Sequence, residues 1–258
     1  MIDLHFNQQL AQGYHGKTQI ARVMTEDWVT RNMYCPICGH PMLCHYEANK
    51  PVADFYCPSC GNDFELKSLQ KQRGPLGNTI NDGQYDKLIE RITSAQNPNF
   101  LFMHYADCMV RNLILIPNHY FVPSIVIKRK PLSPDARRAG WTGCMINIAD
   151  IPQSGKIFIV QNGEVIDKDV VQHQYQRTLF LKQGNLSSRG WTLDVMACIE
   201  RIPDTDFTLD QVYAFTKELE AKHPENNFVQ AKIRQQLQYL RDLGFVDFTS
   251  RGHYHKTK

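Results

Sequence analysis

The sequence predicts an α/β domain that carries a four-cysteine site, followed by a smaller C-terminal winged-helix domain. Three observations support this fold class. Helix and strand patterns alternate in the N-terminal half, two Cys-Pro-x-Cys pairs lie near each other, and three helical patterns precede a hairpin pattern at the C-terminal end. The pattern changes near residue 183, so we expect domains at 1–183 and 184–258.

The composition is that of a globular protein. The chain has 258 residues, of which 42% are apolar and 21% are charged, and this length accommodates two domains. Its apolar runs are too short to span a bilayer, and its N-terminus lacks the pattern of a secretory signal. We therefore expect a cytoplasmic protein without a membrane partner. We also expect a monomer in solution.

Positive charge is concentrated in two segments of a chain whose net charge is only +3. One is 128–138 and the other is 226–258, and in both of them basic residues outnumber acidic ones. Two such concentrations indicate two surfaces for a polyanion. A single charged run is more often a solvated face, so neither segment decides the matter alone.

The eight cysteines include two closely spaced pairs, Cys35-Pro-Ile-Cys38 and Cys57-Pro-Ser-Cys60. Each pair places two thiolates on one tight turn, and two facing turns supply a tetrahedral four-sulfur site for Zn²⁺. Because protein ligands fill all four positions, such a zinc ion is structural rather than catalytic. Disulfides are not expected in a cytoplasmic protein, and redox chemistry needs only one such pair.

The remaining cysteines are isolated in the sequence. We expect Cys44, Cys108, Cys144 and Cys198 to be small buried apolar residues. Cys44 and the nearby His40 are the two alternative ligands for the zinc site.

Two short strands are predicted on either side of the second cysteine pair. Val52, Phe55 and Tyr56 indicate the first strand, and Phe64 and Leu66 indicate the second. The cysteine turn lies between them, where a hairpin needs its turn. A zinc ion bound there would fix the relative position of both strands.

The predicted hairpin gathers charged side chains at one place. It brings Asp54 opposite Glu65, and Lys67 projects from the same face as Glu65 because side chains alternate along a strand. Two carboxylates suit a hard cation such as Mg²⁺, and a lysine can orient or deprotonate an attacking water. An isolated Glu-x-Lys more often forms a solvated salt bridge, so Asp54 and the strand pattern are needed. Glu26, on the preceding helix, can add a carboxylate, although a surface acid is the simpler expectation.

Helical patterns flank this hairpin. In the upstream helix, Ile20, Met24 and Trp28 share one face. The downstream helix is predicted to start at Asn81-Asp82-Gly83, and a buried strand is predicted over 99–105. The expected order is therefore helix, strand, strand, helix and strand.

The Asp…Glu-x-Lys arrangement and this order of elements resemble the PD-(D/E)xK nuclease superfamily. The resemblance implies that Asp54, Glu65 and the backbone carbonyl of Leu66 bind the catalytic metal, with Lys67 beside them. One position departs from the family pattern, because Ala53 rather than proline precedes the aspartate.

The C-terminal segment has the layout of a winged helix. A linker-like run, Ser187-Ser188-Arg189-Gly190, precedes a first helix that is expected to open at Trp191. Thr208 caps a second helix, and a third runs from about 227 to a stop at Gly244. Strand patterns over 245–248 and 253–255 then flank a turn.

The third of these helices carries most of the residues that we expect to meet DNA. Helix-turn-helix proteins place their last helix in the major groove, where glutamine and arginine bond to adenine and guanine edges. The candidates are Gln230, Lys232, Arg234 and Gln235, together with Arg251 in the hairpin turn. A winged helix used for dimerisation is the less favoured alternative.

Over nearly its whole length the chain resembles methyl-directed restriction endonucleases of the DpnI type, which are classed as type IIM. The strings that carry this resemblance are, in order, PVADFYC, FELKS, TINDG, RKPLSP, ARRAGW, LSSRGW and IRQQLQ. The resemblance implies a Mg²⁺-dependent, type II site-specific deoxyribonuclease. It implies cleavage of double-stranded DNA at GATC sites that contain N6-methyladenine, with both domains reading the methylated site. The segment 68–78 differs in length from that of the family.

The resemblance also assigns Arg137, Arg138 and Trp141 to DNA contact, with Trp141 near the methyl groups of the target adenines. Burying one methyl group contributes up to about 0.8 kcal/mol. Without the resemblance, the sequence favours an ordinary core tryptophan at Trp141.

A second hypothesis belongs to another class of protein. A zinc-ribbon and winged-helix DNA-binding regulator without catalytic activity fits the cysteines and the last domain equally well. Asp54, Glu65 and Lys67 separate the two hypotheses, because a regulator does not need them.

Overall fold

The computed structural model describes residues 2–47, 53–72, 77–94 and 96–257. Its largest sheet consists of β1 (Cys44–His45), β2 (Phe55–Tyr56), β3 (Asp63–Gln70), β5 (Asn99–Ala106), β6 (Met109–Ile116), β9 (Ile157–Gln161) and β10 (Glu164–Val165). Within the described residues these strands lie in the order β1-β2-β3-β5-β6-β9-β10. The pair β3–β5 is parallel, and the other five pairs of neighbours are antiparallel.

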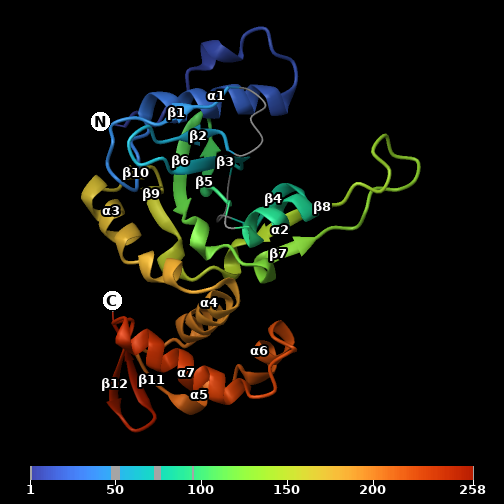
Figure 1. The fold of residues 1–258 in the computed structure, drawn as a ribbon. Helices are drawn as coiled ribbons and strands as arrows, with labels where there is room; N and C mark the ends of the chain where they lie inside the picture. The colour runs from blue at the N-terminus through green and yellow to red at the C-terminus, as the bar shows by residue number, and fades with distance from the viewer. Residues whose placement is uncertain (1, 48–52, 73–76, 95, 258) are drawn as a thin grey trace.

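The strand β5 lies inside this sheet and is buried along its entire length. Its alternate side chains enter two different cores. Leu101 and Met103 pack on the face covered by α1 (Lys17–Asn32), whereas Phe100 and Phe102 pack on the face covered by α2 (Tyr85–Thr93). Figure 1 shows these two helices on different sides of the sheet. The buried strand predicted over 99–105 is therefore confirmed.

The upstream helix is also confirmed as α1. Its apolar face buries Met24, Trp28 and Val29 completely or nearly so, and Ile20 is half-buried at the edge of the same core. The indole N–H of Trp28 donates to the carbonyl of Asp3 at 2.7 Å, so this buried polar group is satisfied. The helix is thereby held against the sheet next to β3.

A second, smaller sheet lies beside α2. It consists of β4 (Thr79–Gln84), β8 (Gly143–Asn147) and β7 (Val126–Lys128), in the order β4-β8-β7. The helix start predicted at residues 81–83 is wrong, because these residues belong to β4 and α2 begins only at Tyr85. The register of the β4–β8 pair shifts between Asp82 and Gln84, so the Asp-Gly signal marks a bulge in a strand.

The C-terminal part has the winged-helix layout (Figure 1). Its elements are α4 (Leu186–Arg201), β11 (Asp206–Thr208), α5 (Leu209–Tyr213), α6 (Thr216–Lys222), α7 (Val229–Asp242), β12 (Val246–Ser250) and β13 (His253–Lys256). The predicted second helix is divided into α5 and α6, and Thr208 caps α5 with a reciprocal capping box. The strands form a sheet in the order β11-β13-β12, so the expected wing hairpin carries an additional short strand.

The linker predicted at Ser187-Ser188-Arg189-Gly190 is wrong, because this run belongs to α4. The helix starts earlier than expected, where the side chain of Asn185 accepts a hydrogen bond from the Ser188 N–H at 2.8 Å. Gly190 is buried within α4, in ordinary contact distance of the His223 ring.

The helix α4 contributes to two cores at once. Leu193 packs in the core that contains Phe100 of β5, whereas Trp191 and Val195 pack in the core of the winged helix. The two parts of the chain are therefore joined through a shared helix. Outside these sheets and helices lie α3 (Lys168–Gln176) and 3-10 turns at Gln8–Ala11, Asn118–Tyr120, Pro123–Ile125, Ile148–Asp150, Gln153–Gly155 and Leu179–Gln183.

Several smaller expectations can also be compared with the structure. Val52 and the positions 73–76 of the segment 68–78 lie outside the described residues, while β3 continues to Gln70. Cys144 and Cys198 are buried as expected, but Cys44 and Cys108 are only half-buried. Among the described helices, none combines the length and apolar character that a membrane span requires.

Candidate active site and cysteine cluster

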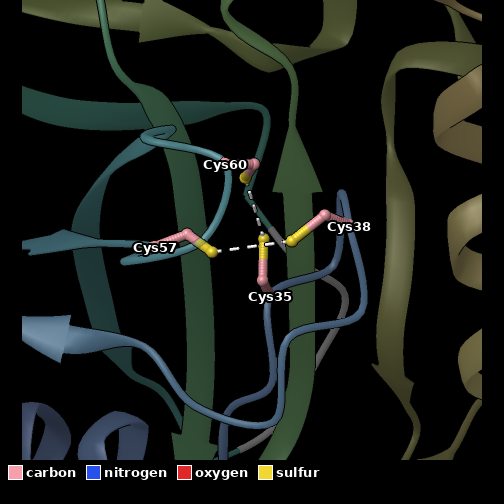
Figure 2. A group of neighbouring side chains, drawn as sticks. All are labelled: Cys35, Cys38, Cys57 and Cys60. Atoms are coloured by element: carbon pink, nitrogen blue, oxygen red, sulfur yellow. Dashed lines mark hydrogen bonds between the residues drawn. The ribbon is translucent and has the colours of Figure 1, made fainter.

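Cys35, Cys38, Cys57 and Cys60 come together at one point, and their sulfur atoms all lie within 4.8 Å of one another. Figure 2 shows Cys35 facing Cys60 and Cys38 facing Cys57, with Sγ–Sγ distances of 3.7 and 3.6 Å. Four sulfurs placed tetrahedrally about 2.3 Å from a zinc ion would be separated by about 3.8 Å. The donor set and its spacing therefore fit a tetrahedral metal ion, and no ligand position is left for water.

The two cysteine turns have the same backbone geometry, which explains why the sequence repeats. Gly39 N–H donates to the carbonyl of Cys35 at 2.9 Å, and Gly61 N–H donates to the carbonyl of Cys57 at the same distance. Both glycines have a positive φ, 80° and 68° respectively, which residues with a Cβ rarely adopt. His40 and Cys44, the alternative ligands, are not part of the group.

The second cysteine turn connects β2 to β3 and sets the register of this hairpin. Phe55 pairs with Phe64, so the next position upstream places Asp54 opposite Glu65. One carboxylate oxygen of Asp54 accepts a hydrogen bond from the Leu66 N–H at 2.7 Å. The backbone of β3 therefore fixes the aspartate, and the carbonyl of Leu66 lies on the same short segment.

Charged side chains alternate around Glu65. Its Oε1 lies 2.6 Å from Nζ of Lys67, and its Oε2 lies 2.8 Å from a guanidinium nitrogen of Arg91 on α2. Lys67 also donates to Oδ1 of Asp82 at 2.6 Å. The Asp82 side chain is only 4% exposed, so β4 holds a nearly buried carboxylate against the lysine.

Glu65 and Lys67 lie between two cavities. The larger has a volume of about 720 Å³ and is also lined by Asp82, Lys87 and Arg91, on the side of α2. The smaller has a volume of about 480 Å³ and is lined by Asp54 and by the N-terminal half of α1. The charged cluster is therefore accessible from two sides of β3.

Burial and neighbouring charges change the ionisation of this cluster. Burial raises the pKa of Asp54, and the nearby carboxylates of Glu65 and Glu26 raise it further, against the opposing hydrogen bond from Leu66. For Lys67, burial lowers the pKa, but the carboxylates of Glu65 and Asp82 outweigh burial and the net shift is upward. The geometry thus favours a protonated lysine next to carboxylates.

Glu26 lies on α1 and lines the smaller cavity together with Asp54. Its carboxylate is half-buried and pairs with Arg22 at 2.7 Å and with His45 at 3.2 Å. Glu26 therefore faces the same cavity as Asp54.

Asp82 and Arg91 are two members of the cluster that the sequence did not reveal. Asp82 was interpreted as a helix start, and Arg91 lies among charged residues of α2 with no motif of its own. Both reach the site only because the small sheet and α2 fold back onto β3. The string TINDG that contributed to the family resemblance was the one signal that included Asp82.

The basic segment 128–138 leads into a long excursion between β7 and β8 (Figure 1). Arg137 and Arg138 are both on this excursion, and the Arg138 guanidinium lies 4.9 Å from the ring of Trp141. Trp141 is half-buried and does not belong to a core cluster of the described residues. Its ring lies against Gly143, where an added Cβ would come within 2.8 Å of the indole. Trp141 is therefore available at the surface.

The helix α7 has one buried and one exposed face. Of the candidate DNA-binding residues, Gln230, Arg234 and Gln235 are exposed and Lys232 is half-buried, and Arg251 is exposed in the wing. Three of them already have side-chain partners on the protein. Lys232 donates to Gln235 at 2.8 Å, and Arg234 donates to the Tyr213 hydroxyl at 2.5 Å.

Phe228, immediately before α7, was not singled out from the sequence. It is 77% exposed, which is unusual for a phenylalanine. Its backbone N–H donates to the side chain of Asn226 at 2.8 Å, so its position at the start of the helix is fixed. Residues at the N-terminal end of such a helix reach base edges in helix-turn-helix proteins.

These features together define a class of protein that acts on DNA. A clustered Asp, Glu and Lys site on a mixed α/β sheet is combined with a C-terminal helix-turn-helix domain. Residues 2–184 match the DpnI model, described as the Dam-replacing family. Residues 187–256 match the companion model, described as the Dam-replacing HTH domain. The chain therefore belongs to the DpnI (Dam-replacing) family, and this membership implies a methylation-dependent restriction endonuclease.

Proposed function

We propose that the protein hydrolyses double-stranded DNA at GATC sites that contain N6-methyladenine, as a Mg²⁺-dependent type IIM endonuclease. The observation that carries this proposal is the hairpin register that sets Asp54 against Glu65, next to Lys67, in a chain of this family. A DNA-binding regulator has no use for such a cluster, so the nuclease is the favoured function.

Asp54, Glu65 and the Leu66 carbonyl would hold the magnesium ion. The donor set fits, because Mg²⁺ prefers oxygen ligands and commonly takes only one or two carboxylates from the protein. The fit is also electrostatic, since Glu26, Asp54 and Glu65 line one cavity and a cation there offsets their mutual repulsion. When bound, the ion supplies Lewis-acid stabilisation of charge on the phosphate.

The remaining side chains act on the phosphate and on the attacking water. In hydrolysis a water oxygen bonds to phosphorus and gives up one proton to solvent, while the bond from phosphorus to the leaving oxygen breaks and the leaving oxygen takes up a proton from solvent. The ammonium of Lys67 orients the water and offsets negative charge that builds on the phosphoryl oxygens. Asp82 keeps that ammonium in place through its 2.6 Å contact.

Zn²⁺ is the metal that we propose for the four cysteines. Its role is structural, because the second cysteine turn joins the paired strands β2 and β3, with Asp54 immediately before β2 and Glu65 on β3. A zinc ion at this turn therefore stabilises the hairpin that positions both carboxylates.

Two surfaces would read the methylated site. Trp141 offers an apolar ring next to Arg138, and the start of α7 offers Phe228 next to Gln230. One buried methyl group contributes up to about 0.8 kcal/mol, or about fourfold in affinity. Reading by both units, 1–183 and 184–258, multiplies this small factor, because each unit contacts the methyl groups separately.

Single substitutions test the assigned site. We expect Asp54→Ala and Glu65→Ala to abolish Mg²⁺-dependent cleavage of methylated GATC while binding of the same duplex survives. Glu164→Ala is the matched control, because Glu164 is an exposed acid on β10 of the same sheet. Retained cleavage in either site variant would contradict the assignment. An equal loss of binding and cleavage would mean that both residues have only a structural role.

A further inference from the structure

A polar cavity of about 240 Å³ lies away from the nuclease site, where the catalytic part meets α4. The side chains that line it come from the end of α2 and the loop after it, from the 3-10 turn at Asn118–Tyr120, and from the stretch that leads from the 3-10 turn at Leu179–Gln183 into α4. They are Ile92, Asn97, Asn118, His119, Lys182 and Arg189. Three segments far apart in the sequence thus converge on one small space.

The cavity contains two cations and no acidic residue. Among the described residues, neither Lys182 nor Arg189 forms an ion pair, and Lys182 instead donates to the Tyr175 hydroxyl at 3.1 Å. The contrast with a nearby lysine is clear, because Lys222 at the same junction pairs with Asp194 at 2.9 Å and with Asp150 at 3.6 Å. The cavity therefore carries uncompensated positive charge.

Buried polar atoms in the cavity also lack partners within the described protein. Asn97 is only 6% exposed, yet neither its amide nitrogen nor its amide oxygen has a hydrogen-bond partner. The same is true of Nε of Arg189 and of Nδ1 of His119, which is 2% exposed. Unsatisfied buried polar groups destabilise a protein, so this concentration indicates a place built to bind something polar.

The hydrogen bonds of His119 define what it can offer. The Thr178 hydroxyl donates its proton to the Tyr175 carbonyl at 2.6 Å, so Nε2 of His119 must be the donor in its 2.7 Å contact with Thr178. Nδ1 is then an acceptor. Burial, together with the charges of Lys182 and Arg189, lowers the pKa of His119 to about 3, so the ring is neutral at physiological pH.

We propose that this cavity binds a phosphoryl oxyanion, held by Arg189, Lys182 and the amide of Asn97. Guanidinium, ammonium and amide N–H groups are donors that match phosphate oxygens. The acceptor atoms of Asn97 and His119 can in turn accept from a protonated oxygen of free phosphate, a proton that a DNA phosphodiester does not carry. The phosphate can come from free phosphate in solution or from the backbone of bound DNA.

The position gives such a ligand a structural consequence. Arg91 of α2 contacts Glu65, and the next residue, Ile92, lines the phosphate cavity. A bound phosphate would therefore tie the helix that reaches the nuclease site to α4, which both cores share. Binding of free phosphate does not depend on the proposed nuclease function. Binding of a DNA backbone phosphate rests on it.

The test is thermal unfolding of the full chain without magnesium, in 0–20 mM potassium phosphate against potassium chloride of equal ionic strength. We expect a saturable rise in Tm with phosphate, because a ligand that binds only the folded state stabilises it.

Asn97→Ala and Arg189→Gln should each weaken the phosphate affinity about tenfold or more, because each removes at least one hydrogen bond to a charged group. Arg177→Gln is the matched control, because this arginine lies at the same junction outside the cavity.

Asn97→Ala also shows whether a weaker response to phosphate comes from a destabilised fold. It removes two unpartnered polar atoms, so its Tm without phosphate should equal or exceed that of the wild type. Its response to phosphate should nevertheless require about tenfold more phosphate than that of the wild type, or more.

DNA binding distinguishes the two sources of phosphate. If the site holds a backbone phosphate, Arg189→Gln should weaken binding to methylated and unmethylated duplex alike and reduce the slope of log affinity against log salt by about one. If it holds free phosphate, DNA binding stays unchanged while the Tm response disappears. The proposal is overturned if Asn97→Ala and Arg189→Gln match Arg177→Gln both in their response to phosphate and in their DNA binding. The cavity would then hold only water. Because the phosphate assay needs no cleavage, a failure of the nuclease assignment would be recognised separately.

Discussion

Asp82→Asn is the change that best probes how the active site is organised. The substitution keeps the size of a side chain that is only 4% exposed. It keeps an oxygen that can accept from the Gly83 N–H, now 2.6 Å away, but it removes the negative charge next to Lys67. Lys67 then retains Glu65 as its one close carboxylate.

The expected magnitude follows from the lost contact. A hydrogen bond between charged groups contributes about 1.5–3 kcal/mol. If the contact serves only to hold the ammonium where the transition state needs it, complete loss corresponds to about 10- to 150-fold in rate. Asp82→Ala should approach the upper end of this range, and Asp82→Asn should lie near the lower end because a neutral hydrogen bond remains.

The assay is single-turnover cleavage of a methylated GATC duplex, with duplex binding measured separately. We expect the single-turnover rate constant of cleavage to fall while binding changes little, since Asp82 contacts the lysine and is not assigned a contact with DNA. Glu90→Gln is the control, because Glu90 lines the same cavity but pairs with Lys87 at the surface. Wild-type cleavage by both Asp82 variants, or a loss of binding as large as the loss of rate, would refute this reasoning.

Three further predictions address the metal, the methyl reading and the domain junction. Cys57→Ser should lower the zinc content measured by atomic absorption and lower the Tm; a fully folded, metal-free variant would contradict the structural role. Trp141→Ala and Phe228→Ala should each reduce the preference for methylated over unmethylated duplex by about fourfold or more, whereas equal losses on both duplexes would indicate a contact with the DNA backbone. A fragment ending at residue 201 should unfold at a higher temperature than one ending at 183, because α4 packs into the N-terminal core; equal Tm values would mean that this packing adds nothing.

The sequence predicted those parts of the fold and site that depend on local patterns. The cysteine pairs could be recognised because four thiolates at this spacing have few other uses. The pairing of Asp54 with Glu65 could be expected because a short turn fixes the register of a hairpin, and alternation then places Lys67 on the same face. The winged helix was visible in its caps and in the stop at Gly244.

The parts that were missed depend on tertiary contacts. The Asp82-Gly83 pair carries the residues of a helix start, but pairing with β8 makes it a bulge in β4 and directs Asp82 toward Lys67. The approach of α2 to β3, which brings Arg91 to Glu65, has no signature within either segment.

Ser187 to Gly190 were misread for a similar reason. Small residues favour turns in isolation, yet here Asn185 caps the helix, and Leu193 and Val195 of α4 are buried in two cores. Tertiary packing therefore outweighed the local preference. The same packing explains why the boundary proposed at residues 183 and 184 falls next to a helix that belongs to both cores.

The central claim is that this chain is a methyl-directed nuclease, and digestion of one plasmid in two methylation states tests it most directly. Purified protein with Mg²⁺ would be incubated with plasmid carrying N6-methyladenine at GATC, and with the same plasmid unmethylated. We expect discrete fragments from the methylated plasmid alone. Cleavage of both plasmids would contradict the methyl dependence, and cleavage of neither, with DNA binding intact, would contradict the nuclease assignment and favour a DNA-binding regulator.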